Sequence, residues 1–196
     1  MQNPIYFEIS KYGRKLTEKG FVCGHGGNIS VKINENMYIT RRGASLEDLT
    51  FRDIICISIH GGSEGERYAS TETLVHREIY INTDYKAIIH VHPPYSIALS
   101  YFFNEIEPLE LEVAYTMDNI KVIEGKSGTI ELGRRIIENI GKNKAVIVRG
   151  HGVFAVGMDL EDAYRTICAV ERNSKQKYLV ETLKTLGYRF IKPKEI

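Results

Sequence analysis

The chain has 196 residues, of which 43% are hydrophobic and 26% are charged, a composition typical of a globular protein with a buried core. Its 26 basic and 25 acidic residues give a formal net charge of +1, which argues against binding of nucleic acid through a strong basic excess. No apolar run reaches the roughly 20 residues of a membrane span, and the first residues show no apolar segment of a secretory signal. We therefore expect a cytoplasmic protein without a membrane partner.

We expect a single domain over residues 1–196, because no linker, repeat or low-complexity segment interrupts the chain. Apolar residues at helical spacing predict helices over 4–19, 71–81, 96–102, 129–139 and 160–186. Alternating or β-branched runs predict strands over 29–33, 37–40, 53–59, 87–92, 120–123, 145–148 and 152–156. Strands interleaved with helices predict a layered α/β or α+β sandwich, and the hairpin near residues 28–40 makes its sheet at least partly antiparallel.

Three local features lead to finer expectations. Ser70 is a good N-cap for the helix over 71–81, which would place Glu72 in a first turn where the helix dipole favours negative charge. The apolar and β-branched run 53–59 predicts a buried strand. The three cysteines lie in apolar stretches and are too scattered for a disulfide framework, so we expect buried thiols at Cys23, Cys56 and Cys168.

The strongest chemical signal is the sequence His90-Val91-His92 at the end of a predicted strand. Side chains two residues apart on a strand share a face, so the two imidazoles project together and can chelate one metal ion. Pro93 and Pro94 end the strand, which would place the pair at a sheet edge beside a cleft. Two histidines that only form hydrogen bonds on a strand surface are the alternative.

A second histidine motif, Arg149-Gly150-His151-Gly152, follows another buried strand. Its two glycines allow the backbone to bend closely around a ligand, and His151 could supply a third imidazole. Three neutral imidazoles with one open position are a common arrangement for catalytic zinc. The alternative is a turn histidine without function.

Two further motifs could bind an anion. The hydroxyls and free amides of Ser70-Thr71-Glu72 lie at a predicted helix start, where an anion is favoured. The glycines of Gly26-Gly27-Asn28 allow several amides to converge on one anion. Taken alone, the first motif is weak evidence, because many helices start in this way, and the glycine motif more often forms an ordinary hairpin entry.

Taken together, these motifs resemble the class II aldolase and adducin family over residues 5–190, approximately. The resemblance is carried, in this order, by Gly-Gly-Asn-Ile-Ser at 26–30, Ile-Thr-Arg-Arg-Gly at 39–43, Ser-Thr-Glu at 70–72, His-Val-His-Pro at 90–93 and Gly-His-Gly-Val at 150–153. It implies a three-layer α/β/α sandwich around a mostly antiparallel sheet. It also implies a homotetramer with active sites between subunits.

The resemblance further implies a divalent-metal-dependent lyase. Such an aldolase would cleave L-fuculose 1-phosphate, or a related deoxy- or pentulose 1-phosphate, to dihydroxyacetone phosphate and an aldehyde through a metal-stabilised enediolate. The implied ligands of one Zn²⁺ per subunit, with Mn²⁺ or Co²⁺ as alternatives, are Glu72, His90, His92 and His151. Glu72 would then leave the metal and act as the catalytic base. The implied substrate-phosphate site comprises Gly27, Asn28, Arg42, Gly43, Ser70 and Thr71.

Several positions depart from the family pattern. Arg42 stands where a small polar residue is usual, and it could grip a phosphate or carboxylate, or could face solvent or a neighbouring subunit. His25 is either a second anion contact or a hairpin residue. The family uses a tyrosine, often from an adjacent subunit, to protonate the leaving aldehyde. The aligned position here holds Glu112, so Tyr115 and Tyr188 are the candidates.

Other functions share parts of this pattern. A methylthioribulose-1-phosphate dehydratase or a pentulose-phosphate 4-epimerase would use the same metal site, although the epimerases usually carry Asp where this chain has Glu72. An adducin-like binding module would lack the metal histidines. His76, four residues after Glu72, could be a further ligand, but packing behind the site is the favoured interpretation.

Overall fold

The computed structural model describes residues 4–191, which form an eight-stranded sheet covered by helices. The strand order is β3-β2-β1-β4-β8-β7-β6-β5. The strands are β1 (Asn28–Ile33), β2 (Asn36–Thr40), β3 (Ile54–Ser58), β4 (Ala87–Val91), β5 (Glu105–Ile106), β6 (Ile120–Ile123), β7 (Ala145–Val148) and β8 (Gly152–Gly157). Neighbouring strands are antiparallel except for β6 and β7, which are parallel.

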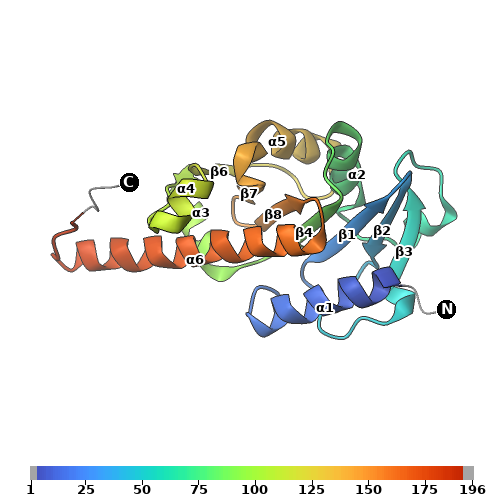
Figure 1. The fold of residues 1–196 in the computed structure, drawn as a ribbon, viewed down its shortest axis with the longest axis horizontal. Coiled ribbons are helices and arrows are strands. Elements are labelled where there is room, and N and C mark those ends of the chain that lie inside the picture. The colour runs from blue at the N-terminus through green and yellow to red at the C-terminus, as the bar shows by residue number, and fades with distance from the viewer. Residues whose placement is uncertain (1–3, 192–196) are drawn as a thin grey trace.

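The helices lie in two layers on opposite sides of the sheet (Figure 1). They are α1 (Pro4–Glu18), α2 (Thr73–Asn82), α3 (Pro94–Ser100), α4 (Leu111–Thr116), α5 (Ile130–Ile140) and α6 (Leu160–Thr185), with short 3-10 segments at Phe51–Asp53, Glu64–Tyr68 and Gly141–Asn143. Helices α2 and α5 cover one face, and α1 and α6 cover the other (Figure 1). The three-layer α/β/α sandwich and its mostly antiparallel sheet are therefore confirmed.

The strand period separates two hydrophobic cores. On β4, Ile89 packs in the core shared with α1 and α6, whereas its neighbour Ile88 packs in the core shared with α2 and α5. On β8, Val153 and Phe154 divide in the same way. Successive strand side chains point to opposite faces, so His90 lies on the same face as Ile88. The side chain of His90 is therefore directed toward the α2 layer.

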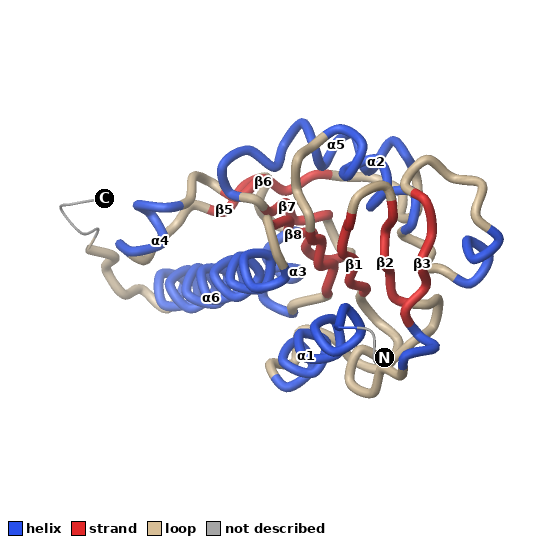
Figure 2. Tube along the Cα trace, turned by 45° about the vertical axis from the view of Figure 1, so that its right-hand side comes forward, coloured by secondary structure: helices blue, strands red, loops and turns tan. Residues whose placement is uncertain are grey.

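The long helix α6 begins under the sheet and extends past the strands toward α4 (Figure 2). Its buried residue Glu171 accepts hydrogen bonds from the backbone amides of Tyr95 and Ser96 at the start of α3, both at 2.9 Å. This contact ties α6 to the segment that follows His90 and His92. None of the helices within residues 4–191 has both the length and the apolar composition needed to cross a membrane.

Helix boundaries differ from the sequence-based expectations at two sites. Helix α2 begins at Thr73 instead of residue 71, and Glu72 itself occupies the N-cap position. Ser70 caps the turn before the helix, where its hydroxyl accepts from the Glu72 amide at 3.2 Å. Helix α3 begins at Pro94 rather than residue 96, because proline is well suited to the first turn of a helix.

The expected buried strand 53–59 and the expected buried cysteines were wrong. Strand β3 covers Ile54–Ser58 and is the last strand of the sheet, so only one of its edges is paired and it is partly exposed. Cys56 lies on its open face and is exposed, as is Cys23 in the loop after α1, while Cys168 on α6 is half-buried. Apolar neighbours in sequence do not bury a cysteine on an alternating strand. The short elements β5 and α4 were not predicted.

The packing of α2 against the sheet yields a stability prediction. Ile79 is 0% exposed in the core between α2 and α5, whereas Ile81 on the same helix is 49% exposed. We expect Ile79→Ala to lower the free energy of unfolding by about 2–5 kcal/mol, because it leaves a cavity. The matched variant Ile81→Ala should change it by less than about 0.5 kcal/mol. Urea unfolding measures both, and equal effects would contradict the assigned helix face.

Candidate metal centre

Three histidines converge at the carboxyl end of β4. His90 lies on β4, His92 follows that strand directly, and His151 lies in the turn between β7 and β8. The Nε2 atom of His90 is 3.1 Å from Nε2 of His92 and 3.2 Å from Nε2 of His151. One ligand atom from each of these residues lies within 4.8 Å of the others. We call these three residues the histidine triad. Strand β4 is a central strand of the sheet. His90 and His92 therefore lie at the end of a central strand and not on an edge strand.

Glycine at position 152 is what allows the two segments to approach. Strand β4 pairs antiparallel with β8, with Val91 opposite Val153. A Cβ atom on Gly152 would lie 2.3 Å from the Val91 carbonyl oxygen and 3.0 Å from Cε1 of His90. The first of these contacts is too short for any real side chain, so a larger residue would push His151 away from β4.

The triad presents neutral nitrogen donors. Nδ1 of His90 donates to the carbonyl oxygen of Val153 at 3.1 Å, which leaves a lone pair on Nε2, the atom that faces the other two rings. Burial and the neighbouring histidines lower the pKa of His90 well below its ordinary value. Burial also lowers the pKa of His92 and of His151. Uncharged imidazoles are the form that binds a metal ion.

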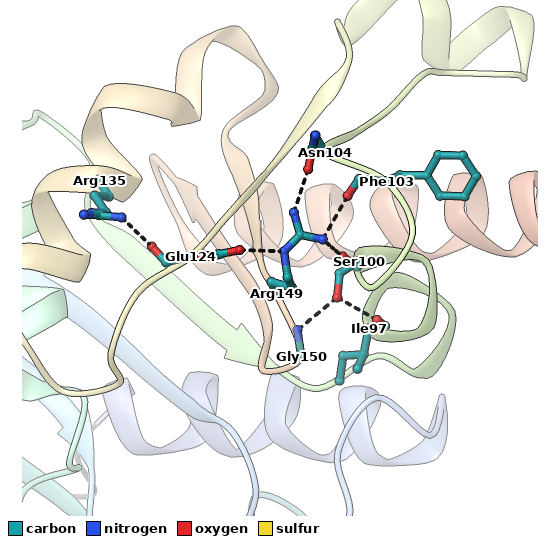
Figure 3. A network of polar contacts seen from close by, with 8 residues as sticks. All are labelled: Ile97, Ser100, Phe103, Asn104, Glu124, Arg135, Arg149 and Gly150. Atoms are coloured by element: carbon teal, nitrogen blue, oxygen red, sulfur yellow. Dashed lines mark hydrogen bonds and ion pairs between the residues drawn. The ribbon is translucent and has the colours of Figure 1, made fainter.

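Arg149 anchors the turn that carries His151 (Figure 3). Its guanidinium donates to the carbonyl oxygens of Ser100 and Phe103 and, at 2.7 Å, to Oδ1 of Asn104, and it pairs with Glu124 at 3.1 Å. The amide of Gly150 donates to the Ser100 hydroxyl at 2.9 Å. Arg149 therefore fixes its own turn to the segment after α3, and its side chain does not line the pocket beside the triad.

Glu72 lies beside the triad without belonging to the group of ligand atoms within 4.8 Å. Its side chain is buried, and the residue is only 2% exposed. One carboxylate oxygen accepts from the hydroxyl of Ser127, and the other accepts from the amide of Gly128 at 3.0 Å. Ser127 was not identified from the sequence, because a lone serine in a loop 55 residues away carries no recognisable signal.

A pocket of about 140 Å³ opens over the triad and Glu72. Every residue expected to bind phosphate lines it, namely Gly27, Asn28, Arg42, Gly43, Ser70 and Thr71. His25, Gly26, Arg41 and Ser127 complete the lining. Oδ1 of Asn28 is buried without a hydrogen-bond partner among residues 4–191, so this wall has unused polar capacity. The sequence motifs thus come together at one cavity.

The two tyrosine candidates lie elsewhere in the chain. Tyr115 on α4 is 74% exposed, and Tyr188 after α6 is 67% exposed. Neither lines the pocket within the described residues of this single chain. The side chain of Glu112 lies outside the described part of the structure.

His76 is buried behind the triad. Its Nδ1 atom is 2.7 Å from the Ser30 hydroxyl, which also contacts the Tyr80 hydroxyl at 2.8 Å. Its ring meets the edge of Phe154, which stacks on His90. The contacts are those of a packing residue, as favoured from the sequence. Burial lowers the pKa of His76 to about 3.

This burial predicts a pH-dependent stability for the metal-free protein. An unfolded histidine binds its proton near pH 6.5, whereas folded His76 binds it only near pH 3. The unfolded state therefore binds more protons between these values, and acid lowers the free energy of unfolding by up to ~1.4 kcal/mol per pH unit for this group. Urea unfolding between about pH 7 and 5 should show a smaller slope for His76→Asn than for the unsubstituted chain. Identical slopes would contradict the assignment.

The anchoring of the His151 turn predicts a further effect. Arg149→Gln removes most of the contacts of the guanidinium, so His151 should lose its fixed position and Zn²⁺ or Co²⁺ should bind about tenfold more weakly. Arg135→Gln is the matched control, because Arg135 reaches only the Glu124 carbonyl of this network, at 3.2 Å. Titration against a competing chelator measures both variants. Unchanged affinity in a folded Arg149→Gln protein would show that the turn holds without the anchor.

Comparison with known proteins agrees with this geometry. Residues 7–178 match the model of the Class II Aldolase and Adducin N-terminal domain. The L-fuculose phosphate aldolase of Methanococcus maripaludis is 30% identical over 179 residues, which cover 90% of this chain and 98% of the relative. The methylthioribulose-1-phosphate dehydratase of Bacillus mycoides is 27% identical, with 85% of each chain covered.

A solved structure shows the same fold. The L-fuculose-1-phosphate aldolase from Thermus thermophilus superimposes with a TM-score of 0.85 at 30% sequence identity, covering 95% of this chain and 98% of that chain. The match of the family model over most of the chain and the likeness of sequence and fold to aldolases lead to one conclusion. The chain belongs to the class II aldolase and adducin N-terminal domain family, and it is a lyase.

Proposed function

We propose that the protein is a divalent-metal-dependent aldolase that cleaves a ketose 1-phosphate to dihydroxyacetone phosphate and an aldehyde. L-fuculose 1-phosphate, or a related deoxy- or pentulose 1-phosphate, is the proposed substrate. The observation that carries the proposal is the convergence of three neutral imidazoles, a buried carboxylate and a polar, partly cationic wall in one pocket. The cytoplasmic location expected from the sequence is part of the proposal.

The residues present fit a divalent metal ion. His90, His92 and His151 offer three nitrogen donors, and the hydrogen bond from Nδ1 of His90 to Val153 leaves its Nε2 free to ligate. Zn²⁺ suits such a set of imidazoles, with Mn²⁺ or Co²⁺ as alternatives. When bound, the ion supplies Lewis-acid stabilisation of the charge that develops on the substrate's carbonyl and hydroxyl oxygens.

The opposite wall would hold the substrate phosphate. Gly27, Gly43, Asn28, Ser70 and Thr71 offer amides and hydroxyls, and Arg42 adds a positive charge. Among the described residues, the guanidinium of Arg42 forms no ion pair with an acidic side chain. Its charge is therefore available to an anion.

Glu72 would move the protons of the reaction. Cleavage removes the proton of the C4 hydroxyl, breaks the C3–C4 bond and returns a proton to C3 of the released fragment. A carboxylate in the pocket can carry the proton at C3, as the acid that returns it in cleavage and as the base that removes it in the reverse direction, without a Schiff-base lysine. Tyr115 or Tyr188 of an adjacent subunit would accept the proton of the C4 hydroxyl as the C3–C4 bond breaks, which requires the proposed homotetramer with sites between subunits.

Metal analysis of the purified protein and a cleavage assay test the proposal together. L-fuculose 1-phosphate, ribulose 1-phosphate and methylthioribulose 1-phosphate would be offered with and without a chelator. Chelator-sensitive release of dihydroxyacetone phosphate is expected. Bound metal without cleavage would favour the dehydratase or the epimerase, and neither metal nor turnover would favour an adducin-like binding module.

Variants separate ligand from base. His92→Ala should lose metal and activity together, by more than the roughly 10- to 100-fold that loss of an outer hydrogen-bond partner costs. Glu72→Gln should keep most of the metal and lower kcat by about 10²- to 10⁴-fold. Glu78→Gln is the matched control, because Glu78 pairs with Arg134 and does not line the pocket. Full activity of Glu72→Gln would exclude Glu72 as the base.

A further inference from the structure

The loop between β6 and α5 reaches across the pocket to Glu72. The Ser127 hydroxyl donates to one oxygen of the Glu72 carboxylate, and the Gly128 amide donates to the other at 3.0 Å. Both oxygens are therefore engaged outside the histidine triad. We call the Ser127 hydroxyl and the Gly128 amide the Glu72 dock.

The loop keeps its shape through contacts of its own. Gly128 has a φ of +69°, and a Cβ atom there would lie 2.7 Å from the carbonyl oxygen of Thr71. Thr129 caps α5 by accepting from the Leu132 amide at 3.2 Å, and its hydroxyl donates to the Lys126 carbonyl at 2.7 Å. The loop thus packs on the backbone immediately before Glu72. Its own contacts fix the positions from which its two donors reach the carboxylate.

The dock is the means by which the Glu72 charge is held. The residue is 2% exposed, and within the described part of the chain its carboxylate forms no ion pair with Lys or Arg. A buried carboxylate needs hydrogen-bond donors or a cation. Two sources exist at this site, namely the dock and a cation held by the triad, and the carboxylate oxygens that occupy the dock lie outside the triad's group of ligand atoms.

We propose that Ser127 is a positioning residue that holds Glu72 in the dock and away from metal coordination, in the place from which it acts on substrate. The proposal rests on the proposed function for its kinetic consequence, and on the contacts of Glu72 alone for its effect on metal binding. Dock and metal compete for one carboxylate. Loss of the serine hydroxyl therefore shifts Glu72 toward the metal.

Three variants test this competition. Ser127→Ala removes one of the two dock donors, Ser127→Thr keeps a hydroxyl, and Ser127→Ala combined with Glu72→Gln removes the competing carboxylate. For Ser127→Ala we expect Zn²⁺ to bind about three- to tenfold more tightly and kcat to fall by about tenfold or more, with KM changed less than about twofold. Ser127→Thr should restore both quantities.

The Glu72→Gln background decides whether the effect passes through Glu72. There, Ser127→Ala should leave Zn²⁺ affinity unchanged. Weaker or unchanged Zn²⁺ binding by Ser127→Ala in the unsubstituted background, or an equal change in both backgrounds, would overturn the proposal. If the chain cleaves none of the sugar phosphates, the proposed function fails. The Zn²⁺ titrations still test the role of Ser127, because they do not depend on cleavage.

Discussion

The close antiparallel contact between β4 and β8 is the constraint on which the site depends. It places the Val153 carbonyl under Nδ1 of His90, stacks Phe154 on the same ring and brings the His151 turn against the end of β4. Only glycine at position 152 permits this approach. The central strands therefore set the tautomer and the burial of His90 and bring the His151 turn close to it.

The histidines and Glu72 are held in place in two different ways. His90 is buried in the sheet, whereas His151 stands on a turn whose position depends on the guanidinium of Arg149 and on the Ser100 hydroxyl. Glu72 stands at a helix start and is held from across the pocket by a separate loop. The histidines proposed to bind a metal ion are thus fixed by the sheet and its anchored turn, while the carboxylate proposed to transfer protons is held by two hydrogen bonds that can be exchanged.

Much of this arrangement could be predicted from local pattern. Strand alternation was sufficient to pair His90 with His92, and the glycines around His151 signalled a tight turn. The order of the motifs indicated a resemblance to a known family, and this resemblance predicted that the distant segments meet at one site. Contacts between segments without a motif could not be predicted: nothing near Ser127 or Arg149 in the sequence indicates their partners. The prediction that Cys56 is buried was wrong for a related reason. Whether a strand lies at the edge or in the centre depends on the whole sheet and not on the strand's own sequence.

The pairing of Arg149 makes the two sides of the pocket differ in positive charge. The guanidinium of Arg149 pairs with Glu124 and donates to Asn104. Arg149 therefore offers no unpaired positive charge to a ligand on the side of the pocket near His151. Arg41 and Arg42 lie on the opposite wall, where Arg41 rests on the ring of Tyr68 and neither forms an ion pair within residues 4–191. An elongated ligand with one anionic end, such as the proposed substrate, would be oriented by this difference, with its charged end toward Arg41 and Arg42 and its uncharged end toward His151.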